Sequence, residues 1–210
     1  MSAEALTQKY VTQMKSIQES LLDFLESDDE QSDLKKTINL LTEQNIRSNK
    51  QIFKSFLYLL LKISKNYHHS ASFYPKIDQI FTQIKDDIKK NFSNSEIFRI
   101  FKSHKRILLY LLENNIIIPD KSIALAISSP KYYKRFYPQF FYPEFEPFFT
   151  ATILQKMKNQ NPDIFEMEIE TFKEKRRIGE NDSYICQLIR DDSVVEFVTF
   201  VTEKMFHFLE

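Results

Sequence analysis

The chain of 210 residues contains one glycine, one cysteine and no tryptophan. The Rossmann fingerprint, the P-loop, the kinase glycine-rich loop and the G-x-S-x-G elbow each need at least two glycines close together, because the backbone there approaches phosphate or adopts a positive φ. The single glycine, Gly179, therefore excludes these motifs in their standard forms. The single cysteine, Cys186, excludes an internal disulfide framework and a zinc site built on a cysteine pair.

Long apolar runs and an excess of one charge are also missing. The longest apolar stretches, residues 56–61 and 116–118, fall far short of the roughly 20 residues of a transmembrane helix, and no apolar signal segment follows Met1. Lys and Arg total 29, as do Asp and Glu, whereas a dedicated nucleic-acid-binding protein is expected to be basic. A lone thiol without a signal peptide predicts a reducing, cytoplasmic location.

Apolar residues recur three or four positions apart along most of the chain, which is the period of an α-helix. Residues 4–26 show the pattern first. The acidic segment 26–33 interrupts it, and we expect a solvated loop there, with Ser32 or Asp33 capping the next helix. A third helix is expected after Ser48, and its apolar residues cover most of the circumference, which indicates a central, buried helix.

Further helix starts are marked by proline or by capping residues. They are expected at Pro75, at Asn94 or Ser95, after Ser103, after Asp120 and at Pro162. Alternating strand patterns and Asn-Gly hairpin turns are missing from the sequence. We therefore predict an all-α fold, a multi-helix domain that is solenoid-like or bundle-like.

Residues 129–149 contain four prolines and ten aromatic residues, which predicts short helical turns with aromatic rings wedged into the core. Within this stretch, segment 131–137 mixes cations with aromatics, as single-strand RNA binders and membrane-surface patches do. Core packing with exposed Lys and Arg tips is the favoured interpretation, and contact with RNA or an anionic membrane is the alternative. The candidate contact residues are Tyr132, Tyr133, Lys134, Arg135 and Tyr137.

The C-terminal residues have the pattern of two short antiparallel helices, residues 182–190 and 193–201, joined by the turn Asp191-Asp192. This arrangement resembles the helical pair of an ankyrin repeat. Such a pair cannot bury its apolar faces alone and must stack on a neighbour. We therefore predict two units, a helical N-terminal domain over residues 1–178 and an ankyrin-like pair over residues 179–210.

Residues 175–198 resemble a segment in a large protist family of ankyrin-repeat proteins, where it joins a helical N-terminal region to the repeats. Residues 110–121 and 141–144 resemble that N-terminal region. The resemblance implies a helical region without assigned activity, followed by repeats that bind proteins. The chain departs from the family because it contains no Thr-Pro-Leu-His tetrapeptide and ends at Glu210, about where the array would begin. The concave ankyrin binding surface is therefore not carried over.

Catalytic and metal-binding candidates lack the spacing that such chemistry needs. The adjacent histidines His68 and His69 point apart unless the backbone bends, and no ligand spacing accompanies them, so a solvated loop is expected. No histidine is close in sequence to Cys186, which is expected to be a small buried thiol. We predict no catalytic residue, metal or cofactor, and no enzymatic activity.

These observations predict an intracellular scaffold that binds an unidentified protein partner. Its apolar C-terminal edge, formed by Val195, Val198, Phe200 and Phe206, is expected to self-associate when no further repeat covers it.

Overall fold

The computed structural model describes residues 3–66, 73–178, 188 and 192–206. Every regular element within these ranges is a helix, and none of the described residues belongs to a β-strand, which confirms the all-α prediction. The first helix of the predicted ankyrin-like pair, residues 182–190, falls almost entirely outside the described residues. The second helix of the pair is present and extends five residues beyond its predicted end, to Phe206.

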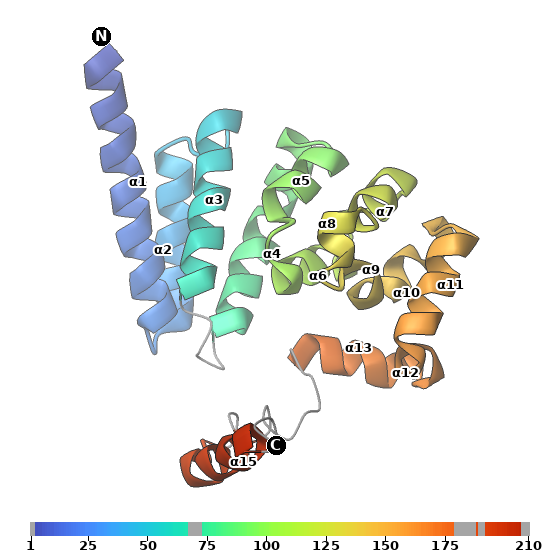
Figure 1. Ribbon diagram of the computed structural model, residues 1–210. Coiled ribbons are helices and arrows are strands. Elements are labelled where there is room, and N and C mark those ends of the chain that lie inside the picture. Colours follow the sequence, from blue (N-terminus) through green and yellow to red (C-terminus); the bar gives the residue numbers. More distant parts are fainter. Residues whose placement is uncertain (1–2, 67–72, 179–187, 189–191, 207–210) are drawn as a thin grey trace.

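The helices of residues 3–160 stand side by side in a row that begins with an antiparallel hairpin (Figure 1). The long helices of the N-terminal half are α1 (Ala3–Glu26), α2 (Glu30–Glu43), α3 (Lys50–Asn66) and α4 (Phe73–Asn91). Shorter helices continue the row, and they are α5 (Asn94–Phe101), α6 (Lys105–Glu113), α7 (Lys121–Ile127), α8 (Pro130–Tyr133), α9 (Tyr137–Phe140), α10 (Tyr142–Phe145), the 3-10 helix η1 (Glu146–Phe148) and α11 (Ala151–Gln160). The last described helices are α12 (Pro162–Glu166), α13 (Ile169–Ile178) and α15 (Val194–Phe206).

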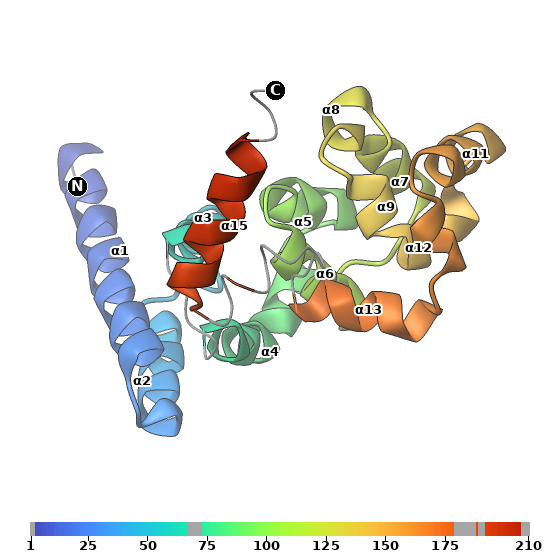
Figure 2. The same cartoon turned by 60° about the horizontal axis from the view of Figure 1, so that its bottom comes forward.

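The arrangement is solenoid-like. The principal helix–helix contacts join elements that are neighbours or next neighbours along the chain, from the pair of α1 and α2 to the pair of α11 and α12. Figures 1 and 2 both place α1 and α2 at one end of the row and α11 at the other. A row built in this way buries the apolar faces of each helix against the helices before and after it.

Side-chain caps determine several helix starts. Ser93 and Glu96 form a capping box at α5, and Asp120 caps α7 as predicted, by accepting from the backbone N–H of Ile123 at 2.8 Å. The cap of α2 is Asp29, not Ser32 or Asp33, so part of the acidic segment is already helical.

Three other predicted starts are shifted by one or two residues. Asn49 takes the place of Ser48 by accepting from the N–H of Ile52, and His104 takes the place of Ser103. Helix α4 begins at Phe73, two residues before Pro75. Pro75 is tolerated in the first turn because the N–H groups of that turn have no partner within the helix.

One continuous apolar core runs through the row from α1 to α11. Helix α3 is the buried helix that its sequence predicts, with Phe53, Phe56 and Leu57 all fully inaccessible to solvent. In the C-terminal half the core is largely aromatic. The rings of Tyr132, Tyr137, Phe141, Phe145 and Phe149 follow one another with centroid separations of 5.0–6.4 Å. This ladder confirms the prediction that the proline-rich stretch forms short helical turns with aromatic rings in the core.

A buried cation joins α4 to the turn between α1 and α2. Lys76 is 4% exposed, and its Nζ donates hydrogen bonds to the carbonyl oxygens of Leu25 at 3.0 Å and Ser27 at 2.6 Å. These carbonyls lie where α1 ends, at the negative end of the helix dipole. The Lys76 ammonium thus satisfies polar groups that the helix itself leaves without partners.

We expect Lys76→Met to lower the free energy of unfolding by about 1–3 kcal/mol, because both carbonyls lose a charged donor. Lys85→Met removes an exposed lysine from the same helix and should change stability by no more than about 0.5 kcal/mol. Urea denaturation followed by circular dichroism measures both. Equal losses in the two variants would show that the buried hydrogen bonds contribute nothing specific.

Candidate interaction surface

The structure divides the basic and aromatic segment 131–137 between the core and the surface. Tyr132 is 9% exposed and Tyr137 is 3% exposed, and their rings meet at 5.0 Å. The Tyr137 hydroxyl also donates to the carbonyl of Lys102 at 2.5 Å. Their rings are therefore unavailable to a partner, which corrects their inclusion among the contact residues and supports the core-packing interpretation.

The other three candidates of this segment lie nearer the surface. Lys134 and Arg135 are exposed. Tyr133 is half-buried, and the Lys156 ammonium on α11 lies 4.2 Å from the centroid of its ring. The segment therefore presents its cations to solvent, while the faces of its tyrosines are covered by other side chains.

A sharp reversal of the backbone at Phe136 produces this division. Phe136 has φ 57° and ψ 35°, the left-handed region, which costs a non-glycine residue roughly 1–2 kcal/mol. Phe136 is 58% exposed. Pattern analysis missed Phe136, because no glycine or asparagine marks the position as a turn.

Lys105 on α6 holds this reversal in place. Its Nζ donates to the carbonyl of Arg135 at 2.5 Å and lies 3.4 Å from the carbonyl of Phe136. The same ammonium sits above the rings of Tyr137 and Phe140, at 5.0 and 5.1 Å from their centroids. Burial lowers the pKa of Lys105 to about 8. The contact spans some 30 residues, so nothing in the local sequence indicates it.

Helix α15 carries the second predicted contact surface. Val195 is 74% exposed and Val198 is 56% exposed, and Val194 beside them is 62% exposed. The spacing of three and four residues places these valines on one side of the helix. Phe200 is half-buried, and the side chain of Phe206 lies outside the described residues. Both valines of the predicted apolar edge, Val195 and Val198, are therefore exposed.

Titratable side chains gather between α4 and α6. The Asp78 carboxylate lies 3.9 Å from the Arg106 guanidinium, which stacks over the Tyr74 ring at 5.4 Å. The Tyr110 hydroxyl donates to the backbone carbonyl of Asp78 at 3.0 Å. Burial raises the pKa of Asp78 to about 6, despite the opposing charge of Arg106. Because ion pairing and aromatic stacking account for these groups, the cluster acts as a brace between two helices.

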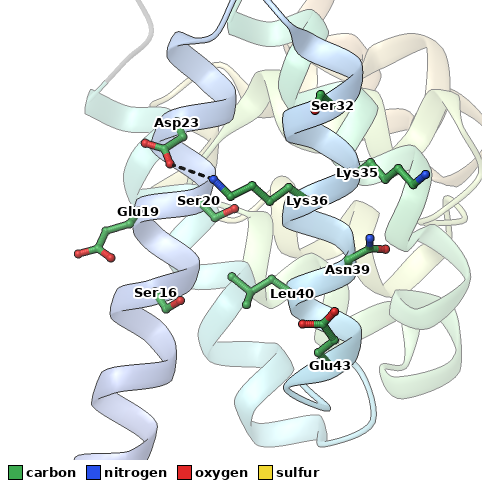
Figure 3. A pocket seen from close by; sticks show the side chains of 10 residues that line it. All are labelled: Ser16, Glu19, Ser20, Asp23, Ser32, Lys35, Lys36, Asn39, Leu40 and Glu43. Carbon is green, nitrogen blue, oxygen red and sulfur yellow. Dashed lines mark ion pairs between the residues drawn. The ribbon is translucent and has the colours of Figure 1, made fainter.

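A groove of about 560 Å³ lies on the outer side of the α1–α2 hairpin (Figure 3). Lys36 reaches across it to Asp23, with 3.6 Å between Nζ and Oδ2. Glu19 and Lys35 point away from each other, and Glu43 lies farther along α2 (Figure 3). Because charges of both signs line the groove and do not converge on one point, it has the character of a polar outer face and not of a catalytic pocket.

Within the described ranges, no three His, Cys, Asp or Glu side chains come together as a metal site would require. His68, His69 and Cys186 lie outside these ranges. No helix in the described part of the chain combines the length and apolar character needed to cross a membrane.

Comparisons with protein-family models, with curated proteins and with solved structures find no match to this chain. The resemblance to ankyrin-repeat proteins therefore stays a prediction from the residues that carry it.

The pKa of Asp78 predicts a pH-dependent stability. Its folded-state value of about 6 exceeds its ordinary value of 3.8, so the folded state binds this proton more tightly than the unfolded state. Ionising Asp78 therefore destabilises the fold as the pH rises from about 4 through about 6. We expect Asp78→Asn to be progressively more stable than the natural chain over this interval. Thermal melts at pH 4, 5, 6 and 7 measure the difference.

Asp86→Asn, an exposed site on the same helix, is the matched control and should show no such trend. A difference between Asp78→Asn and the natural chain that stays constant from pH 4 to pH 7 would contradict the prediction.

Proposed function

We propose that this chain is a non-catalytic protein-interaction module of the ankyrin-repeat type, working in the cytoplasm, and that α15 provides its contact surface. The cytoplasmic setting is supported by the lone cysteine, which suits a reducing compartment. The partner proposed for this surface is a second copy of the chain, since stacked helical repeats bury one another's apolar faces.

The exposed valine face of α15 carries the proposal. Valine side chains with more than half of their surface exposed, three of them on one side of one helix, form an apolar strip that water solvates poorly. Within the row formed by α1 to α11, the buried apolar side chains meet in a single core. A partner helix laid on α15 would extend this mode of packing by one further layer.

The arrangement of charged groups supports a scaffold over an enzyme. Several ion pairs of the described residues connect different helices, as Arg176 and Glu144 join α13 to α10 at 2.7 Å. The groove on α1 and α2 is open and lined by charges of both signs. Catalysis needs polar groups that converge where a substrate can bind, and these groups pair with one another instead.

Self-association provides the test. We expect the natural chain to show a mass that increases with concentration in size-exclusion chromatography with light scattering. The double variant Val195→Glu with Val198→Glu should stay monomeric, because burying two carboxylates opposes association. Loss of two valine contacts, at about 1.5 kcal/mol each, corresponds to an association constant more than 100-fold lower.

Val11→Glu is the control, since Val11 on α1 is 56% exposed, the same fraction as Val198. This variant should associate like the natural chain. A natural chain that remains monomeric up to high concentration, or a double variant that associates like the control, would contradict α15 as the contact surface.

A further inference from the structure

A second exposed feature lies at the turn between α8 and α9. The α8–α9 tip is defined here as Lys131, Lys134, Arg135 and Phe136, together with Lys156 of α11. Phe136 is the most exposed phenylalanine of the described residues, at 58%. The four basic side chains are all exposed. The tip thus combines one exposed apolar ring with four exposed cations.

These cations have no carboxylate partners among the described residues. Other basic side chains of the protein form ion pairs, such as Arg47 with Asp87 and Lys50 with Glu96, at 3.0 and 2.9 Å. Lys156 instead lies over the ring of Tyr133, and Lys131 lies 5.9 Å from the ring centroid of Tyr132. The tip therefore carries an uncompensated positive charge on a chain whose formal net charge is zero.

The tip is also held in one conformation. The Phe136 N–H donates to the carbonyl of Tyr133 at 3.0 Å, and the Phe136 carbonyl accepts from Phe140 at 3.1 Å. The hydrogen bond from Lys105 to the Arg135 carbonyl and the buried ring of Tyr137 anchor this backbone to the core. A strained residue that its surroundings hold firmly in place is a feature associated with ligand contacts. A preformed tip also loses little conformational entropy when it binds.

We propose that the α8–α9 tip binds an anionic membrane surface, with the Phe136 ring entering the interface and the four cations contacting lipid headgroups. Cationic side chains around an apolar tip match the negative potential and the apolar interior of such a surface. This role goes beyond the protein-interaction function and uses a different surface, so each can fail without the other.

The burial of the tyrosines favours a membrane over RNA. Single-strand binders stack successive bases on several exposed rings. Here Tyr132 and Tyr137 are buried and Tyr133 is covered by Lys156, which leaves Phe136 as the one well-exposed ring of the tip. A single ring with several cations provides one point of insertion and not a stacking platform.

The absence of tryptophan from the chain permits a direct test. Phe136→Trp places a unique fluorophore at the tip. We expect its emission to shift to shorter wavelength with vesicles containing 30% phosphatidylserine, and not with pure phosphatidylcholine vesicles. Phe148→Trp, at the other exposed phenylalanine of the described residues, should show no shift. No shift at Phe136, or equal shifts at both positions, would overturn the proposal.

Vesicle co-sedimentation tests the ring and the charges separately. Phe136→Asn removes the ring but keeps a residue that tolerates the left-handed conformation, so the fold should be preserved. We expect its binding to phosphatidylserine vesicles to fall at least tenfold. The triple variant Lys131→Gln, Lys134→Gln and Arg135→Gln should lose roughly fivefold per charge, with the residual binding weakened by salt.

The control removes three exposed lysines from α4, through Lys85→Gln, Lys89→Gln and Lys90→Gln, which makes the same change in net charge. It should bind vesicles like the natural chain. Equal losses in the two triple variants would overturn the proposal by showing that only net charge matters. Binding to single-stranded poly(U) that is tighter than binding to the vesicles and is lost in Phe136→Asn would overturn it in favour of a nucleic-acid surface.

Discussion

The structure depends on the contact of each short helix with its neighbours in the row. Helices of four to ten residues, such as α8, α9 and α12, are too short to be stable in water on their own. They persist because their apolar sides join one continuous core with the helices before and after them. In the C-terminal half, where the helices are shortest, that core is built from large aromatic rings, which bury much surface per residue.

Scarcity of glycine imposes a second constraint, because many helices end on a glycine in the left-handed conformation. In the described part of the chain this conformation is taken by other residues, including Asn45 after α2 and Asn115 after α6. Carbonyls at helix ends and turns are satisfied by side chains from distant helices. Lys76, Lys105 and Arg176 are all buried or half-buried cations that donate to such carbonyls. The same contacts that complete these ends also connect successive parts of the row.

In this mode of construction several charged groups of the described residues lie between helices. Asp78 has a raised pKa, which in many proteins accompanies catalysis, yet its neighbours are an ion pair and aromatic packing. The two surfaces proposed for contacts are the valine face of α15 and the tip around Phe136. These surfaces differ in chemistry, since one is apolar along a helix and the other is a single ring among cations.

The sequence by itself determined the all-α fold, most helix positions and the exposed valines of α15, because these follow from local periodicity and caps. Helix starts are misplaced by one to four residues where several capping residues stand together, as at Asp29 and Asn49. Tertiary structure alone decided which rings of segment 131–137 face the core. That choice depends on the reversal at Phe136, which Lys105 stabilises from some 30 residues away. A contact at that separation leaves no periodic signal, so Tyr132 and Tyr137 stand among the candidate contact residues of the sequence, while Phe136 does not.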